Sequence, residues 1–373
     1  MHVVIVNYPL PKSRSPEALL TEFHASTGWA EAVSRAGAQV TVVQRFHEDG
    51  ELLHNGVRYL LVRDGTGRWP RAWQIPRRVH AAAVAAQPDL LHLQGEIFPL
   101  QTRALRRLLP PRTPLLVQHH GGDAPVARGR LRLLLARIGF ASANGFLFTA
   151  EELARPWRAA GIIRPGTPVY VVLEASTPLR PPEAPDVRLR GAPALLWVGR
   201  LHSIKDPLTV LEGLARALRR LPNAALTMAY GSEELLDAVR ERAERPDLQG
   251  RVELLGRLPH ERLPHYYAAA DLFVLGSRRE AGGFALIEAL ACGLPPAVTD
   301  IPAFRAITGE QVGAHWAPGD AEACANALVT VATAGRAEQR RAAQERFARA
   351  LSWDVVGREA LAAYADARGR LCA

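Results

Sequence analysis

The sequence predicts an α/β protein made of two doubly wound, Rossmann-like domains, each with a parallel sheet. Three observations lead to this prediction. Strand-like and helix-like segments alternate along the chain, which is the pattern of βαβ units. The 373 residues suffice for two domains of ordinary size. Residues 174–193 are rich in proline with a charged middle, which is typical of a linker and predicts a boundary near residue 180.

The predicted elements follow from apolar runs of strand length and from amphipathic helical spacing. In the first domain, residues 1–178, we expect strands at 3–7, 40–44, 57–62, 90–93, 115–118, 145–148 and 169–172, and helices at 19–36, 71–86, 100–109, 130–140 and 151–160. In the second, residues 179–352, we expect strands at 194–198, 225–229, 252–255, 272–275 and 297–299, and helices at 208–220, 284–292 and from 320 onward. Ligands of such sheets bind beyond the carboxyl ends of the strands, so the residues that follow each strand are the candidates.

Several function classes lack their defining loops. The sequence contains no G-x-G-x-x-G, no G-x-x-x-x-G-K-[ST] and no G-x-S-x-G. These absences argue against a Rossmann dehydrogenase, a P-loop NTPase and an α/β-hydrolase. Two histidines, His260 and His265, are five residues apart with a proline between them, so they cannot share a helix face, and we assign no metal site.

Composition indicates a globular cytoplasmic protein. Three widely spaced cysteines argue against a disulfide framework, no apolar run reaches bilayer length, and the start MHVVIVNYP reads as a strand and not as a signal peptide. Residues 1–180 hold 22 basic and 13 acidic residues, whereas residues 181–373 hold 24 of each, so the first half carries the whole net charge of +9. Two interpretations stay open: contact with an anionic partner such as the inner membrane face, and an arginine-rich solvated surface. Nucleic-acid binding is not expected, because no recognised module is present.

The segment 272–300, LFVLGSRREAGGFALIEALACGLPPAVTD, carries the strongest functional signal. A strand precedes Gly282 and Gly283, and the helix that follows is apolar on every face except at Glu288. A helix N-terminus suits an anion such as phosphate, while the carboxylates of Glu280 and Glu288 suit hydroxyl groups. Phosphate plus hydroxyls describes a sugar nucleotide. The alternative is that Glu280 is a solvated loop residue and Glu288 a hydrogen-bonded core residue.

Glu280 and Glu288 form an E-x7-E pair followed by ALACGLP. This segment closely resembles the signature of the retaining nucleotide-sugar glycosyltransferases of family four, the group 1 glycosyl transferases. The resemblance implies the GT-B fold, in which two Rossmann-like domains face a central cleft. It also implies that Glu280 faces the donor sugar and that Glu288 binds the nucleotide ribose. The family's usual Gly-Phe-Gly is Ala281-Gly282-Gly283 here, and we expect the loop to contact the donor through Gly282, Gly283, Phe284 and Ala285.

Further segments carry the same resemblance in the second domain. The sequence GRLHSIKDP resembles the family's Gly-Arg-x5-Lys segment at Gly199, Arg200 and Lys205. Arginine and lysine together can neutralise a diphosphate, and Lys205 is one of only two lysines in the chain. An ion pair of Lys205 with Asp206 or Glu212 is the alternative. Arg257 lies in a segment that borders the nucleobase in the family, and residues 353–373 resemble the family's terminal helix, which packs back on the first domain.

In the first domain the resemblance is mainly architectural. The exception is HHGGD, where His120 and Asp123 fit the family's His-Gly-x-Asp segment, whose histidine contacts the donor sugar near the reacting centre. Many relatives carry a Gly-Gly loop after the first strand, whereas this chain has prolines, Lys12 and Arg14 there. We take Lys12, Arg14 and Asp123 as acceptor-side candidates.

These observations predict a retaining, metal-independent glycosyltransferase. It moves a hexose-type sugar from a nucleoside-diphosphate sugar to an acceptor hydroxyl, with Arg200, Lys205, Glu280 and His120 as catalytic residues and no cofactor. Two alternatives remain, namely a sugar-nucleotide epimerase of the same fold and a non-catalytic nucleotide-sugar-binding protein. The sequence leaves open the donor sugar, its base, the oligomeric state and the acceptor, which could be a saccharide, a lipid-linked molecule or a small molecule.

Overall fold

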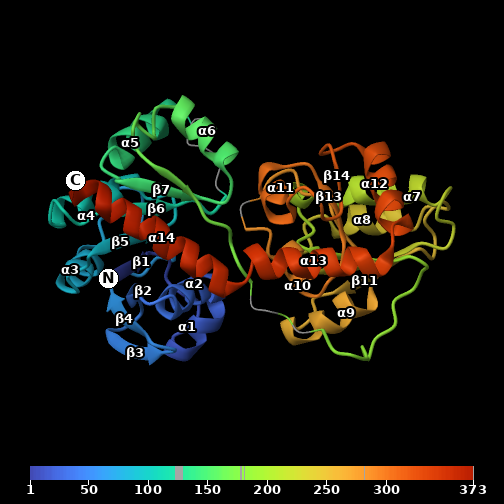
Figure 1. Ribbon diagram of the computed structural model, residues 1–373, viewed down its shortest axis with the longest axis horizontal. Helices are drawn as coiled ribbons and strands as arrows, with labels where there is room; N and C mark the ends of the chain where they lie inside the picture. Colours follow the sequence, from blue (N-terminus) through green and yellow to red (C-terminus); the bar gives the residue numbers. More distant parts are fainter. Residues whose placement is uncertain (122–128, 177–178, 180, 281, 373) are drawn as a thin grey trace. The chain divides into compact units, whose positions relative to one another are not determined.

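The computed structural model describes residues 1–121, 129–176, 179, 181–280 and 282–372. The chain divides into two compact units, residues 1–175 with 353–373, and residues 176–352 (Figure 1). The boundary at Ser176 lies three residues before the predicted start of the second domain, and the C-terminal helix belongs to the first unit. Among the described residues, none of the helices combines the length and the hydrophobicity that crossing a bilayer requires.

The first unit is built on an eight-stranded sheet in the order β3-β4-β2-β1-β5-β6-β7-β8. Its strands are β1 (His2–Asn7), β2 (Gln39–Phe46), β3 (Gly50–His54), β4 (Val57–Arg63), β5 (Leu90–Gln94), β6 (Leu115–Gln118), β7 (Gly145–Phe148) and β8 (Val169–Val171). Its helices are α1 (Pro16–Glu22), α2 (His24–Arg35), α3 (Arg77–Ala85), α4 (Pro99–Leu108), α5 (Arg130–Phe140), α6 (Glu151–Ala159) and α14 (Trp353–Cys372). Seven of these strands run parallel, as the alternation of elements predicted.

The edge strand β3 is a departure from the prediction. It pairs antiparallel with β4 through a tight hairpin at Asn55 and Gly56, which both have positive φ, 46° and 78°. An Asn-Gly pair between two short apolar runs is the strongest short-range hairpin signal, and the prediction overlooked it. Helix α3 is shorter than predicted and starts only at Arg77, because Pro76 disfavours helical geometry at the residue before it.

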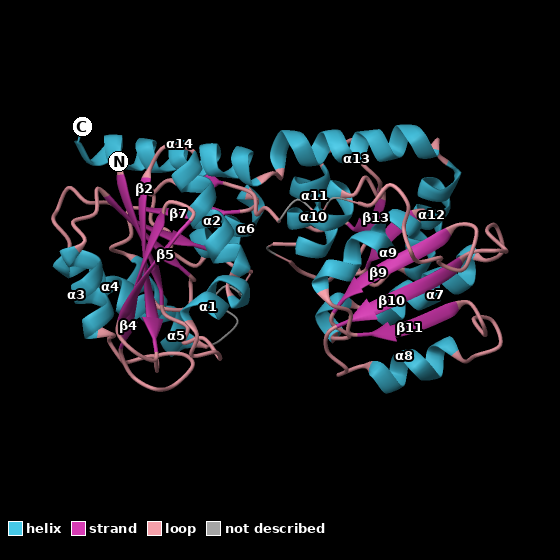
Figure 2. Ribbon diagram, turned by 90° about the horizontal axis from the view of Figure 1, so that it is seen from below, coloured by secondary structure: helices cyan, strands magenta, loops and turns pink. Residues whose placement is uncertain are grey.

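The second unit has a six-stranded, fully parallel sheet in the order β11-β10-β9-β12-β13-β14 (Figure 2). Its strands are β9 (Ala194–Gly199), β10 (Ala225–Tyr230), β11 (Val252–Gly256), β12 (Leu272–Leu275), β13 (Pro296–Thr299) and β14 (Ala314–Trp316). Its helices are α7 (Pro207–Ala217), α8 (Leu236–Ala243), α9 (Leu263–Ala269), α10 (Phe284–Ala291), α11 (Pro302–Thr308), α12 (Ala321–Thr333) and α13 (Arg336–Ala350), with 3-10 turns at Ser203–Lys205 and His260–Arg262. The predicted fold class, α/β with two parallel-sheet domains, is confirmed.

Alternate residues of β1 point into two separate cores of the first unit, as the strand period of two requires. Val3 and Ile5 face a cluster shared with α2 and α14, and Val4 and Val6 face a cluster under helices α3 to α6. The C-terminal helix therefore forms part of a core whose first buried member is the third residue of the chain, Val3.

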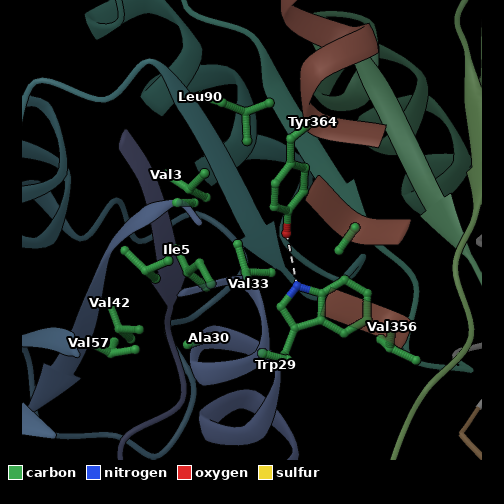
Figure 3. Packing of buried hydrophobic residues seen from close by; sticks show 14 of the residues in the cluster. Val3, Ile5, Trp29, Ala30, Val33, Val42, Val57, Leu90, Val356 and Tyr364 are labelled. Carbon is green, nitrogen blue, oxygen red and sulfur yellow. Dashed lines mark hydrogen bonds between the residues drawn. The ribbon is translucent and has the colours of Figure 1, made fainter. Parts of the chain in front are cut away.

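A buried hydrogen-bond chain ties α14 to that core (Figure 3). Trp29 Nε1 donates to the Tyr364 hydroxyl over 2.9 Å, and this hydroxyl lies 2.7 Å from His92 Nδ1. Because indole can only donate, the Tyr364 hydroxyl accepts from it and keeps its own proton free to donate to His92 Nδ1. Burial lowers the pKa of His92 to about 3, so the imidazole stays neutral and can accept that bond.

Candidate functional site

The loops after β9 and β12 meet at the switch point of the second sheet. These two strands are neighbours, and the strand order reverses between them, which is where doubly wound sheets bind ligands. The Arg278 N–H donates to the Ile204 carbonyl over 2.8 Å, and the Arg278 guanidinium lies 2.8 Å from the Asp206 carboxylate. A Cβ at Gly276 would lie 2.9 Å from the Asp206 carbonyl oxygen, so this close approach needs glycine.

The contact between these two loops places Lys205 next to Glu280. The Lys205 ammonium is hydrogen-bonded to Glu280 Oε1, and Ser277 Oγ donates to the same oxygen over 3.1 Å. The two charged side chains are only 14% and 13% exposed. Burial and the neighbouring Arg200 guanidinium lower the pKa of Lys205 to about 8. Two of the predicted catalytic residues, 75 positions apart in the sequence, thus form one largely buried ion pair.

Local structure fixes the position of Lys205. The 3-10 turn Ser203–Lys205 is capped by His202 Nδ1, which accepts from the Ile204 N–H over 3.0 Å. Asp206 then adopts a left-handed conformation, with φ of 44°, and caps α7. Asp206 and Glu212 pair with Arg278 and Arg242, respectively, and not with Lys205.

The N-terminus of α10 carries the four predicted donor-binding residues 282–285. Gly283 caps the helix with φ of 56°, and a Cβ there would meet the Ile307 side chain at 2.6 Å. Both constraints require glycine at this position. The first turn of a helix presents N–H groups that have no carbonyl partner within the helix, at the positive end of its dipole. This helix end and Glu280 belong to the same loop between β12 and α10.

Glu288 is buried on α10 and is held by protein groups. It accepts hydrogen bonds from the Tyr267 hydroxyl at 3.1 Å and the Ser176 hydroxyl at 3.3 Å, and it lies 3.0 Å from His260 Nε2. Hydrogen bonding to this carboxylate raises the pKa of His260, whose side chain is 54% exposed. The carboxylate thus has the donors that a buried charge requires.

Among the other predicted donor-site residues, the Arg200 guanidinium is close enough to Lys205 to add to burial in lowering its pKa, whereas Gly199 and Arg257 make no hydrogen bond to the pair in the described part of the chain. Arg200 is exposed immediately after β9, and Gly199 ends that strand with its carbonyl accepting from the Gly231 N–H over 3.1 Å. Arg257 is exposed after β11, the edge strand.

In the first unit, His120 lies beside two buried glutamates. Its backbone N–H donates to Glu96 Oε2 over 2.9 Å, and its Nδ1 lies 3.5 Å from Glu174 Oε1, which also accepts from Gln118 Nε2 over 3.2 Å. The His120 side chain is 39% exposed. Burial opposes protonation of His120, but the carboxylates of Glu174 and Glu96 outweigh it and raise its pKa above the ordinary value.

Among the described residues, no hydrogen bond or ion pair joins the predicted acceptor-side residues Lys12 and Arg14 to His120. The Lys12 and Arg14 side chains are exposed in the segment before α1, where the Lys12 backbone N–H donates to both Glu22 carboxylate oxygens over 3.0 and 2.8 Å. Asp123 falls outside the described residues.

Sequence reasoning missed the partners that position these groups. Ser277, Tyr267 and His260 carried no motif, and His260 was considered only as a zinc ligand. Glu174 follows shortly after β8, and this place after a strand was the available signal. No cluster of three or more histidine, cysteine, aspartate or glutamate side chains suited to a metal occurs in the described residues.

A buried lysine–glutamate pair, a helix N-terminus and a parallel-sheet switch point occur together here, and this combination suits an anionic, hydroxyl-bearing ligand. Residues 185–349 match the family described as glycosyl transferases group 1. These residues lie within the second unit and resemble a glycosyl transferases group 1 domain. The two parallel-sheet units are those of the GT-B fold class.

Solved structures share this fold over nearly the whole chain. Sucrose-phosphate synthase from Thermosynechococcus elongatus is similar with a TM-score of 0.74 and 18% identity, covering 99% of both chains. The Anabaena protein HepE in complex with UDP is similar with a TM-score of 0.73 and 16% identity, covering 98% of this chain and 100% of that one.

Curated relatives match shorter stretches. Mannosylfructose-phosphate synthase from Agrobacterium fabrum is 38% identical over 28% of this chain and 25% of its own length. The GDP-mannose:cellobiosyl-diphosphopolyprenol alpha-mannosyltransferase from Xanthomonas oryzae is 29% identical over 66% of this chain and 63% of its own. Glycogen synthase from Mycobacterium tuberculosis is 31% identical over 48% of this chain and 44% of its own. The chain thus spans less than two thirds of the length of each of these three relatives.

Proposed function

We propose that this protein is a retaining glycosyltransferase that moves a hexose-type sugar from a nucleoside-diphosphate sugar to an acceptor hydroxyl. The observation that carries the proposal is the buried Lys205–Glu280 pair beside Arg200, where the loops after β9 and β12 meet. The match to the group 1 family, the similarity to HepE in complex with UDP and the sugar-transfer activities for which the relatives are named support it.

The proposed mechanism uses charge that is already in position. Negative charge builds on the diphosphate as the bond to the sugar breaks, and Arg200, Lys205 and the N-terminus of α10 stabilise it. When phosphate oxygens replace the Glu280 carboxylate on Lys205, that carboxylate becomes available to accept hydrogen bonds from sugar hydroxyls. The acceptor attacks from the face that the diphosphate leaves, the departing phosphate takes the acceptor proton, and the protein's own cations supply the charge, so no metal or cofactor takes part.

The test is binding of UDP, GDP and ADP, each free and as its common sugar conjugates, measured by calorimetry. One diphosphate should bind to the wild type and at least about tenfold more weakly to Lys205→Ala, because a charge-assisted hydrogen bond is worth about 1.5–3 kcal/mol. Arg219→Ala is the matched control, since Arg219 is an exposed cation of the same unit. If Lys205→Ala bound the diphosphate as tightly as the wild type does, the proposed donor site would be wrong.

We further propose that the acceptor is bound by the first unit around His120. The raised pKa of His120 favours the protonated ring, which can donate to a sugar oxygen, and the carboxylates of Glu174 and Glu96 hold its ring and its backbone, respectively. His120→Ala should lower turnover while leaving the affinity for the diphosphate unchanged. A loss of diphosphate affinity in that variant would contradict an acceptor-side role.

For its location, we propose that the protein is cytoplasmic and contacts an anionic membrane. On α5 the side chains of Leu131, Leu134 and Ile138 lie at helical spacing and are 69%, 52% and 39% exposed, and Arg130 and Arg132 flank them. An apolar row between arginines suits the interface of an anionic bilayer. The free thiols of the buried Cys292 and Cys324 fit a reducing compartment.

Sedimentation with vesicles tests this contact. The protein should bind to phosphatidylcholine vesicles that contain phosphatidylglycerol and not to phosphatidylcholine alone. The double variant Leu131→Glu with Leu134→Glu should lose binding, whereas Leu53→Glu, at a side chain 73% exposed on β3, should keep it. Equal sedimentation of the double variant and the wild type would rule out this surface.

A further inference from the structure

A cavity of about 500 Å³ lies at the switch point of the first sheet, where the strand order reverses between β1 and β5. Asn7 at the end of β1, Gln94 at the end of β5 and His120 after β6 line its inner side. Its volume lies within the range of small-molecule sites. The position corresponds to that of the Lys205 pair in the second sheet, but the side chains around the cavity are different.

The cavity combines apolar faces with buried polar groups. Trp69 and Phe98 lie on one side, with ring centroids 5.9 Å apart and Trp69 48% exposed. The polar residues Asn7, Gln94 and Glu96 are 4%, 7% and 6% exposed. Aromatic faces suit the C–H face of a sugar ring, and amide and carboxylate groups suit its hydroxyls.

The ionisable groups in the described lining are the carboxylates of Glu22 and Glu96 and the imidazoles of His24 and His120. Glu22 and Glu96 both line the cavity, and the described lining residues include neither lysine nor arginine. Burial alone would raise the pKa of Glu96, but His119 and His120 hold it below its ordinary value, so Glu96 remains a carboxylate. A phosphate group here would meet the like charge of two carboxylates, and the described lining offers imidazoles but no arginine or lysine to offset it.

We propose that this cavity binds the acceptor and that the acceptor's reactive end is an uncharged sugar or polyol without a phosphate group. This inference rests on the proposed glycosyl transfer and goes further by naming the substrate class. Trp69 and Phe98 pack against the ring, and Asn7, Gln94 and Glu96 hydrogen-bond its hydroxyls beside His120. Glu22 and Glu96 exclude phosphorylated sugars.

Direct binding tests the proposal without a known reaction. The probes are glucose, mannose, galactose and myo-inositol, each paired with its monophosphate and observed by saturation-transfer NMR with the full-length protein. At least one uncharged probe should bind, with its phosphate at least about tenfold weaker. Trp69→Ala should weaken that probe about tenfold, since an aromatic contact contributes about 0.5–1.5 kcal/mol beyond the area it buries. Trp73→Ala is the matched control, because Trp73 is 72% exposed in the same segment and lies outside the cavity.

The second part of the test uses a variant that should gain affinity for a phosphorylated probe. Ile97 lines the cavity and is 45% exposed, so Ile97→Lys places a cation there on a side chain that is not part of the core. This variant should bind the phosphorylated probe more tightly than wild type does. Tighter binding of a phosphorylated probe by the wild type, or no binding of any uncharged probe, overturns the proposal. Diphosphate binding measured on the same protein separates the two failures, because it tests the donor site alone.

Discussion

The carboxyl ends of the two sheets carry different sets of ionisable groups. In the second unit the switch point between β9 and β12 presents Lys205 and Arg200 beside a helix N-terminus. In the first unit the switch point between β1 and β5 presents carboxylates and imidazoles around a cavity with aromatic walls. Two sheets of the same topology at their centres thus provide one place suited to an anion and one suited to hydroxyl groups.

This difference shows that fold and ligand class are set separately. Both sheets place loop residues at the same point of their topology, and the type of residue in those loops then decides the ligand. Four experiments test this difference between the two units.

The largest effect is expected on turnover when Lys205 of the second unit is replaced. Lys205→Ala should lower turnover by about 10²–10³-fold, the usual cost of removing one preorganised charge stabiliser. Steady-state kinetics with the donor found by calorimetry measures this loss, and Arg219→Ala should retain the wild-type rate. If Lys205→Ala turned over at the wild-type rate, the second unit would not owe its activity to this cation.

The next effect separates the stabilities of the two units. A Cβ at Gly357 of α14 would lie 2.3 Å from the Ala32 carbonyl oxygen, so Gly357→Ala should force α2 and α14 apart and destabilise the first unit by about 2 kcal/mol. Gly369→Ala in the same helix meets nothing within 4 Å and should be neutral or stabilising by up to about 1 kcal/mol. Hydrogen-exchange mass spectrometry should show faster exchange in β1 and α2 only. Faster exchange in β9 to β14 as well would mean that the two units unfold together.

The third effect is the pH dependence of diphosphate binding. With a pKa of about 8, Lys205 loses its proton as the pH rises, so affinity should be about tenfold weaker at pH 9 than at pH 7. Lys205→Arg stays charged and should remove most of this change. The same lowered pKa makes the free energy of unfolding rise between about pH 8 and 10.5, because the unfolded chain holds the proton more tightly. A wild-type affinity that stays flat from pH 7 to 9 would contradict the assignment.

The smallest effect concerns the pKa of His120 in the first unit. Glu174→Gln removes a carboxylate next to His120 but keeps an oxygen that can accept from Gln118, so the fold should persist and the pKa of His120 should fall. Imidazole NMR titration measures this change, and the exposed His24 is the internal control. An unchanged His120 titration would show that Glu174 does not act on it.

The sequence predicts the sheets well because their signal is local. Strands β6, β7 and β12 have the predicted bounds, since each is a short apolar run bordered by turn residues. Edge strand β3 was missed because it is half exposed and its apolar residues are few, although the Asn-Gly turn was visible. The helix predicted at 19–36 divides at Phe23, where φ of −111° and ψ of 40° interrupt it, and nothing in the residue pattern marked this break.

The candidate site is predictable only in part, because hydrogen-bond partners depend on the fold. The E-x7-E segment pointed to Glu280 and the rarity of lysine pointed to Lys205, but their pairing requires two neighbouring strands. The same holds for Glu288, whose partners Ser176, Tyr267 and His260 come from three separate segments. The roles of these residues in binding and turnover stay predictions for the experiments above.

The place of α14 has a consequence for biosynthesis. Trp353, Val356 and Tyr364 belong to the core that β1 begins, yet they follow all of residues 176–352 in the chain. At about 5–20 residues per second, a ribosome needs roughly 10–35 s to make that intervening stretch. During this time the first unit lacks one wall of its core, whereas the second unit already has every strand of its sheet before the last helix is made. The part of the protein that is translated first is therefore completed last, and its exposed β1–α2 surface is where we expect a chaperone to bind the nascent chain.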